Sequence, residues 1–312
     1  MTAPYDHEAL WMKAKLFLNR AMDNDGLRSF DEQALWASLA LELLAKAALA
    51  RVSPLLIAEP TEDGTNILIA SGLVKGDARF SSVKASTLFA RCQKAFKPFS
   101  SDAASSFSNP RNEYIHGPGI GFMALPPHAW WPKYWAQAAI LVAALDREIA
   151  DLVGRDRETT VTDHLYQNTK NVEHQTEARI ERARQRLRQY RDGTMSAKVA
   201  AEWERQVHLT AGLPYEAPDV CPACEATGLL EGDEIADVEE TYERLEEGDE
   251  RLDAPDPEPT VTLTIDTAYF SCPTCHLTLD RFDYILQAGL PETFTTEGDI
   301  DDLYPEPEYG ND

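Results

Sequence analysis

The sequence lacks several features that would place it in particular protein classes. No stretch of its 312 residues approaches the ~18 consecutive apolar residues that a membrane helix needs. The longest apolar run of note extends only from Ala138 to Leu145. The first ten residues, MTAPYDHEAL, show no basic segment followed by an apolar one, which is the pattern of a secretory signal. We therefore expect a cytoplasmic protein that has no contact with a membrane.

Cysteine is scarce, and its arrangement fits a metal site better than a disulfide framework. Four of the five cysteines form two CxxC pairs. Such pairs in a reducing compartment favour a metal site, whereas disulfide frameworks are typical of short secreted chains. The fifth, Cys92, has no partner in the pattern, and a buried thiol is its expected role.

Basic residues are almost absent from the last third of the chain. Residues 216–312 contain 28 Asp and Glu residues but only three basic ones, which gives a formal net charge of −25. Residues 1–215 have a net charge of +1. The total charge of −24 therefore does not exclude RNA as a ligand of the N-terminal part.

Hydrophobic periodicity predicts a mainly α protein with a small β domain near its C-terminal end. The expected parts are a helical domain at 4–153, a basic helical connector at 154–213, a β module at 214–290 with a disordered acidic insertion at 231–259, and an acidic tail at 291–312.

Within the helical domain, apolar spacing predicts helices over 5–22, 29–50, 83–96 and 128–153. Ser29 and Glu32 have the spacing of a capping box, and the helix that they begin is apolar on nearly every face, which predicts a central position. A short helix is expected after Asn109-Pro110, ending at Gly117.

The stretch NPRNEYIHG, residues 109–117, contains the most informative motif, with Arg111, Asn112 and His116 in the order R-N-x-x-x-H. Five steps of ~100° separate the directions of Arg111 and His116 by roughly 140° about a helix axis. One helix cannot easily aim both side chains at one atom, but two copies packed face to face can. The spacing favours a site in a homodimer.

Through Arg111, Asn112 and His116, and through the pattern of residues 40–49, the chain resembles the HEPN superfamily over residues 4–153. The resemblance implies an all-α, HEPN-like bundle that dimerises and cuts single-stranded RNA without a metal. The family includes toxins and anti-phage effectors, so an endoribonuclease of antiviral defence is the leading expectation.

The chemistry of the three side chains agrees with RNA cleavage by attack of the 2′-hydroxyl. His116 titrates near neutrality and can serve as general acid or base. Arg111 presents a planar, permanently charged fork that matches phosphate oxygens. Asn112 can hold a phosphate or orient the histidine. The expected products are a 2′,3′-cyclic phosphate and a 5′-hydroxyl.

Other interpretations remain open. Arg111 and His116 can be surface residues beside a turn, or the domain can be an inactive HEPN-like dimer that recruits a protein. Nucleotide sensing by the helical domain is a third reading. Glu42 and Lys46, four residues apart in an apolar helix, form either a surface ion pair or a buried pair that supports the active cleft.

Two further groups are candidates for contacts with RNA. Six arginines lie within residues 179–191, and we expect Arg179, Arg182 and Arg186 to bind RNA. The aromatic segment from His128 to Trp135 either stacks bases or packs in the core or a dimer interface, and packing is favoured for most of its residues. These residues are His128, Trp130, Trp131, Tyr134 and Trp135.

The two CxxC pairs predict a zinc ribbon with four cysteine ligands, Cys221, Cys224, Cys272 and Cys275. Two such turns complete a tetrahedron of thiolates, and a closed site of this kind holds structural Zn²⁺. The β-rich segment 261–270 leads directly into the second pair. A redox role for each CxxC is the alternative, and His276 is a spare ligand.

The acidity of the ribbon module disfavours nucleic acid as its ligand, so a protein partner is expected there. We also consider that the insertion 231–259 competes with RNA for the arginine-rich helix.

Overall fold

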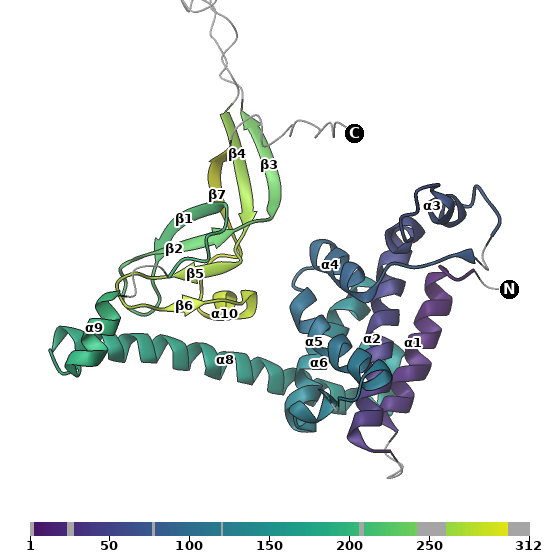
Figure 1. Cartoon of the computed structure of the whole chain (residues 1–312), viewed down its shortest axis with the longest axis horizontal. Coiled ribbons are helices and arrows are strands. Elements are labelled where there is room, and N and C mark those ends of the chain that lie inside the picture. Colours follow the sequence, from purple (N-terminus) through teal and green to yellow (C-terminus); the bar gives the residue numbers. More distant parts are fainter. Residues whose placement is uncertain are drawn as a thin grey trace, which may run out of the picture. The chain divides into compact units, whose positions relative to one another are not determined.

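The computed structural model describes residues 3–23, 28–76, 79–119, 121–205, 209–241 and 260–298. Within them the chain is mainly helical, with small antiparallel sheets in its C-terminal part (Figure 1), as the sequence predicts. The chain divides into two compact units, unit 1 at Met1–Thr169 and unit 2 at Lys170–Asp312. None of the described helices combines the length and apolar character needed to cross a membrane.

Unit 1 is a bundle of helices built around one apolar core. Its elements are α1 (His7–Met22), α2 (Phe30–Val52), η1 (Pro54–Ile57), α3 (Thr65–Ala70), α4 (Ala85–Ala95), α5 (Ser101–His116), η3 (Gly121–Ala124), α6 (Pro127–Ala144), α7 (Ile149–Val153) and the first part of α8 (Arg155–Arg191).

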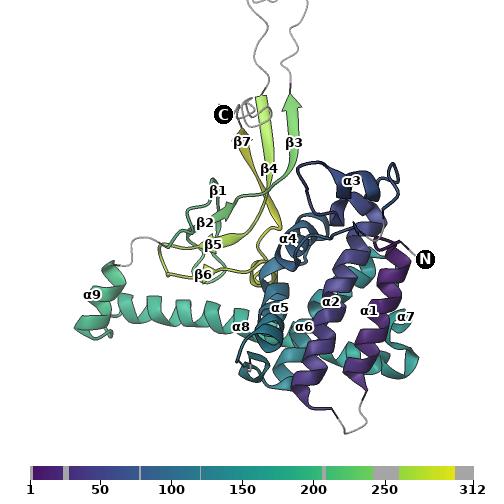
Figure 2. The ribbon, with the colours of Figure 1, turned by 45° about the vertical axis from the view of Figure 1, so that its right-hand side comes forward.

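Helix α2 lies at the centre of unit 1, as its apolar residues on nearly every face predict. It packs against α1, α4, α5 and α6, and Figure 2 shows it flanked by α1 on one side and α5 on the other. Many of its buried residues are alanines, among them Ala37, Ala40 and Ala48, each fully buried. Small side chains let the neighbouring helices approach closely.

The motif helix and the start of α2 differ from the sequence prediction. The helix of the R-N-x-x-x-H motif does not begin after Pro110, because Ser100 caps the backbone N–H of Ala103 at 3.2 Å and α5 continues through the proline. Proline removes one N–H, but burial of Phe107 and Arg111 on the same helix compensates for the lost bond. Ser29 precedes α2 without making a side-chain capping bond, so the capping box is wrong there.

The helix expected over 128–153 is two helices. Asp146 has a φ of 52°, in the left-handed region, and this residue interrupts the helix between α6 and α7. Helix α7 then begins at a capping box that Glu148 and Asp151 form. The reciprocal bonds of this box satisfy the amides that the break exposes.

The described part of unit 2 contains the end of α8, two further helices and two antiparallel sheets. Strands β1 (Tyr215–Val220), β2 (Thr227–Gly232), β5 (Tyr269–Ser271) and β6 (Thr278–Leu279) form one sheet in the order β1-β2-β5-β6. Strands β3 (Ile235–Thr241), β4 (Thr260–Asp266) and β7 (Thr293–Gly298) form the other, with β4 in the middle. The helices are α9 (Ala197–Arg205) and α10 (Phe282–Gln287).

Part of the predicted acidic insertion and tail is ordered sheet. Residues 231–232 belong to β2, 235–241 form β3 and 293–298 form β7, so the expectation of disorder at 231–259 and of a tail from 291 is wrong for these residues. The acids of β3 lie on the exposed faces of an edge strand, where charge costs little, while β4 buries Val261, Leu263 and Ile265. Residues 242–259 and 299–312 lie outside the described residues.

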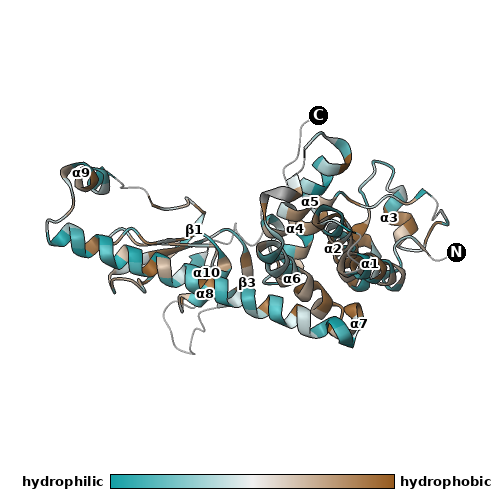
Figure 3. Cartoon of the chain, turned by 90° about the horizontal axis from the view of Figure 1, so that it is seen from below, coloured by the Kyte–Doolittle hydropathy of each residue, from teal (hydrophilic) through white to brown (hydrophobic). Residues whose placement is uncertain are grey.

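The helix expected as an exposed connector also contributes to both cores. Figure 3 shows mostly hydrophilic residues along α8, with apolar ones between them. Among the latter, Val161 is buried in the core of unit 1, and Ala183 and Leu187 are buried in the core of unit 2 together with Trp203 of α9. Hydrophilic composition concealed these apolar positions because they are widely spaced.

Candidate functional site

The motif helix α5 presents Arg111 toward α2. Arg111 is 7% exposed, and its Nη1 donates to Oε2 of Glu42 at 2.5 Å. Its Nε and Nη2 both donate to Oδ1 of Asn112, at 3.1 and 2.8 Å. Three of the five guanidinium N–H groups are thus occupied, and their partners fix the plane of the fork.

Glu42 joins the arginine to a lysine of α2. Oε1 of Glu42 accepts a hydrogen bond from Nζ of Lys46 at 2.8 Å, and their side chains are 19% and 17% exposed. Burial tends to raise the pKa of Glu42, but Lys46 and Arg111 outweigh it and hold the pKa below its usual value. Glu42 and Lys46 therefore form a largely buried ion pair that contacts the motif through Arg111, rather than a surface ion pair.

These residues border a pocket of about 370 Å³. Its lining is almost entirely polar and comprises Glu42, Lys84, Ala85, Ser86, Ser105, Ser108, Asn109, Arg111 and Asn112. Sequence reasoning missed Lys84 and the three serines. The signal for Ser105 and Ser108 is their helical spacing ahead of Asn112 on α5, whereas Lys84 and Ser86, at the start of α4, carry no such signal.

His116 does not line this pocket together with Arg111. It is exposed at the last residue of α5. Asn112 and His116 are one turn apart on the same helix face, and that face also carries Ser105, Ser108 and Asn109 of the pocket wall. The helical spacing of ~100° per residue separates the directions of Arg111 and His116 about the axis of α5 by roughly 140°.

The aromatic segment of α6 lies mostly in the core. Trp130 is 2% exposed, and Tyr134 and Trp135 are fully buried. Trp130 stacks on Tyr134 with ring centroids 5.1 Å apart, and the Tyr134 hydroxyl donates to the carbonyl of Ala37 at 2.9 Å. Base stacking is thus excluded for these three side chains. Trp131 is partly buried and His128 is exposed.

The four cysteines of the CxxC pairs converge in unit 2. All four Sγ atoms lie within 4.8 Å of one another, and the Cys221–Cys275 and Cys224–Cys272 pairs are each 3.6 Å apart. A tetrahedral ion with Zn–S bonds of ~2.3 Å requires S–S separations of about 3.8 Å. The closest pairs join different CxxC turns, which favours a shared metal over two redox sites.

The backbone of the two turns repeats closely. The amides of Glu225 and His276 donate to the carbonyls of Cys221 and Cys272 at 3.0 and 2.9 Å. Glu225 and His276 have φ values of 62° and 59°, so the residue after each second cysteine is left-handed. His276, the spare ligand of the sequence prediction, is not in the cluster, and its ring stacks on Trp203.

The thiols also fit a cation chemically. Hydrogen bonding with Cys272 raises the pKa of Cys221 to about 12, and hydrogen bonds from Cys221 and Cys275 lower the pKa of Cys272. Cysteine binds a metal ion as the thiolate, so a divalent ion bound here would replace thiol protons. The buried cluster can hold one metal ion.

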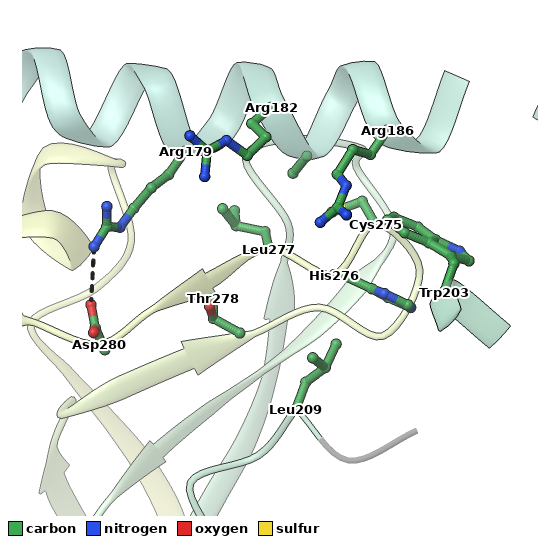
Figure 4. A pocket seen from close by; sticks show the side chains of 11 residues that line it. Arg179, Arg182, Arg186, Trp203, Leu209, Cys275, His276, Leu277, Thr278 and Asp280 are labelled. Atoms are coloured by element: carbon green, nitrogen blue, oxygen red, sulfur yellow. Dashed lines mark ion pairs between the residues drawn. The ribbon is translucent and has the colours of Figure 1, made fainter. Parts of the chain in front are cut away.

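Arg179, Arg182 and Arg186, predicted to bind RNA, lie together in unit 2. They line a pocket beside the second cysteine turn (Figure 4). Arg184, between them on α8, instead donates to the carbonyls of Ala223 and Pro222 at 3.0 and 2.8 Å.

No protein-family model matches this chain, and no curated protein or solved structure is detectably similar to it.

Proposed function

We propose that unit 1 is a metal-independent endoribonuclease of the HEPN type that cleaves single-stranded RNA as a homodimer. The observation that carries the proposal is the arrangement of Arg111, which is oriented by Glu42 and Asn112 at the wall of a polar pocket. A phosphodiester has the charge and the oxygen geometry that this pocket suits.

Arg111 keeps donors available for a phosphate. Glu42 and Asn112 occupy three of its five N–H groups, and two have no partner among the described contacts. Lys84, Ser86, Ser105 and Ser108 supply a further cation and hydroxyl groups around the same space. The pre-oriented fork can stabilise the charge that develops on a pentavalent phosphate.

His116 supplies the acid–base group of the proposed reaction. Its exposure at the end of α5 leaves the ring accessible to a substrate. In the reaction, the 2′-hydroxyl loses a proton and its oxygen attacks phosphorus. The 5′-oxygen leaves and gains a proton, which gives a 2′,3′-cyclic phosphate and a 5′-hydroxyl.

A second copy of α5 completes the site in this proposal. The ~140° between the directions of Arg111 and His116 prevents one helix from aiming both at one phosphorus atom. Two facing copies bring the arginine of one chain toward the histidine of the other. Unit 2 then carries structural Zn²⁺ on its four cysteines, and the enzyme acts in the cytoplasm as a toxin or antiviral effector.

The competing function is a dimeric module without catalysis that recruits a protein through its acidic unit. The ion pair between Arg111 and Glu42 favours it, because a buried pair can serve packing alone.

To test the proposal, the full chain is incubated with single-stranded RNA in magnesium-free buffer that contains EDTA. We expect fragments that end in 2′,3′-cyclic phosphate, and at least a 100-fold loss of rate in His116→Ala and Arg111→Lys. His128→Ala removes another exposed histidine and serves as the control. Cleavage of no RNA by the wild-type protein, or equal rates for all variants, would refute the enzyme.

Mixing variants tests the shared site. When His116→Ala and Arg111→Lys chains are mixed and allowed to exchange, heterodimers contain one site with both native residues. Part of the wild-type rate should return. Growth arrest on expression of the wild-type chain, absent with His116→Ala, tests the toxin role.

A further inference from the structure

A pocket of about 360 Å³ lies in unit 2 between α8 and the second cysteine turn. Arginine side chains reach it from α8, and the opposite wall comes from residues 275–280 (Figure 4). Its lining comprises Arg179, Arg182, Ala183, Arg186, Trp203, Leu209, Cys275, His276, Leu277, Thr278 and Asp280.

The three arginines occupy one face of α8 at i, i+3 and i+7 spacing. Arg179 is held in place by Asp280, at 3.7 Å, and by the ring of Tyr284, 4.5 Å from its guanidinium carbon. Arg182 and Arg186 are exposed, and no hydrogen bond or ion pair to either is found among the described residues. Two guanidinium groups therefore line the pocket without a direct acidic partner in the described part of the chain, since Asp280 pairs with Arg179.

An aromatic stack borders the same pocket. The ring centroids of Trp203 and His276 are 3.8 Å apart at an interplanar angle of 14°, and the guanidinium carbon of Arg186 lies 5.9 Å from the Trp203 ring. Nδ1 of His276 is buried and has no hydrogen-bond partner among the described residues.

The arginines of the pocket are not needed to support the cysteine turns. That contact is made by Arg184, which binds two carbonyls of the first turn from another face of α8. Within the described residues, Arg182 and Arg186 make no hydrogen bond or ion pair that would explain their convergence with Arg179, and Arg186 only approaches the ring of Trp203. Like charges so close together repel, and an anion between them removes the repulsion.

We propose that this pocket binds the phosphate groups of a small phosphorylated molecule, about the size of a nucleoside diphosphate. Guanidinium forks match phosphate oxygens, and the volume lies at the small end of the range for ligand pockets. The net charge of −25 on residues 216–312 repels a long polyanion, whereas a small ligand interacts mainly with the local arginines. The site is independent of the proposed ribonuclease activity.

The test is isothermal titration calorimetry of the full, metal-loaded chain with inorganic pyrophosphate, ADP and a single-stranded RNA. We expect binding of pyrophosphate and ADP that weakens at high salt. Arg182→Ala/Arg186→Ala should weaken it at least about tenfold. Asp280→Asn should strengthen binding, because it frees Arg179 from its carboxylate partner.

The matched control is Arg188→Ala/Arg191→Ala, which removes the same charge from α8 outside the pocket lining and should bind like the wild type. An unchanged metal content and helical circular dichroism verify that the variants fold. The proposal is overturned if neither small phosphate binds, if both double variants lose binding equally, or if only RNA binds in an Arg182- and Arg186-dependent manner.

Discussion

The guanidinium of Arg111 and the carboxylate of Glu42 are joined by a 2.5 Å hydrogen bond between residues 69 positions apart in the chain. The pair connects the central helix of unit 1 to the helix that carries the R-N-x-x-x-H motif. Stability and the proposed chemistry therefore depend on the same contact, and variants can separate the two.

Glu42→Gln is expected to lower the free energy of unfolding of unit 1 by about 3 kcal/mol at pH 7, because Arg111 then stays buried without a counter-charge. The pKa of Glu42 in the folded protein lies below 4.5. Its contribution is thus fully present above that pH and is lost as the pH falls through the folded pKa. Urea unfolding followed by tryptophan fluorescence, between pH 7 and pH 3, measures both effects.

Five of the six tryptophans lie in unit 1, so the fluorescence reports mainly on that unit. The stability difference between the two proteins should shrink below pH 4.5. A difference that stays constant down to pH 3 contradicts the assigned pKa direction.

Asn112→Asp tests whether the pocket acts on a phosphate, and it rests on the proposed function. Asn112 interacts with Arg111 through Oδ1, which accepts two hydrogen bonds. An aspartate oxygen can accept the same two bonds, so we expect the variant to fold. The added negative charge opposes phosphate binding, and RNA cleavage should fall at least about tenfold with an unchanged unfolding midpoint. Full activity of the folded variant would argue against phosphate at this wall.

Metal removal should change the reactivity of four cysteines and leave the fifth unaffected. Burial raises the pKa of Cys92 to about 12, so this thiol remains protonated at pH 8. We expect one metal ion per chain and no alkylation by iodoacetamide in the native protein. After chelation, mass spectrometry should find Cys221, Cys224, Cys272 and Cys275 modified.

Cys272→Ser should lose the metal without affecting unit 1. Alkylation of Cys92 in the folded protein, or full metal content in Cys272→Ser, would contradict these assignments.

Glu231 is 1% exposed, and its carboxylate accepts from the backbone amides of Ala211, Gly212 and Leu213 at 2.9, 2.7 and 3.2 Å. Glu231→Ala leaves these amides without their acceptor, and we expect unit 2 to lose about 2 kcal/mol of stability. Glu216→Ala, at the exposed position paired with Glu231 across β1 and β2, is the control. Denaturation followed by circular dichroism should show no loss in the control.

Local patterns in the sequence predicted the features that depend on backbone geometry over a few residues. The CxxC spacing predicted the cluster of four cysteines, and the step of a helix predicted that Arg111 and His116 diverge. The same reasoning misplaced the start of α5, because packing of Phe107 and Arg111 keeps the helix intact through Pro110.

Acidic composition was a poor guide to order in unit 2. It predicted disorder at residues that form β3. Composition does not show that β3 can pair with β4, which buries Val261 and Leu263 in the core of unit 2. It also counted Glu231 among solvated acids, although that carboxylate is buried among backbone amides.

The amino-acid sequence by itself determined the helical periods, the divergence along α5 and the two cysteine turns, since each follows from bond geometry within a few residues. Only the tertiary structure decided that Glu42 meets Arg111 and that Arg182 and Arg186 face the turn containing His276. These contacts depend on how apolar helix and strand faces pack together over long stretches of chain. A charged side chain has many possible partners in the sequence, and only the packing decides which of them lies within reach.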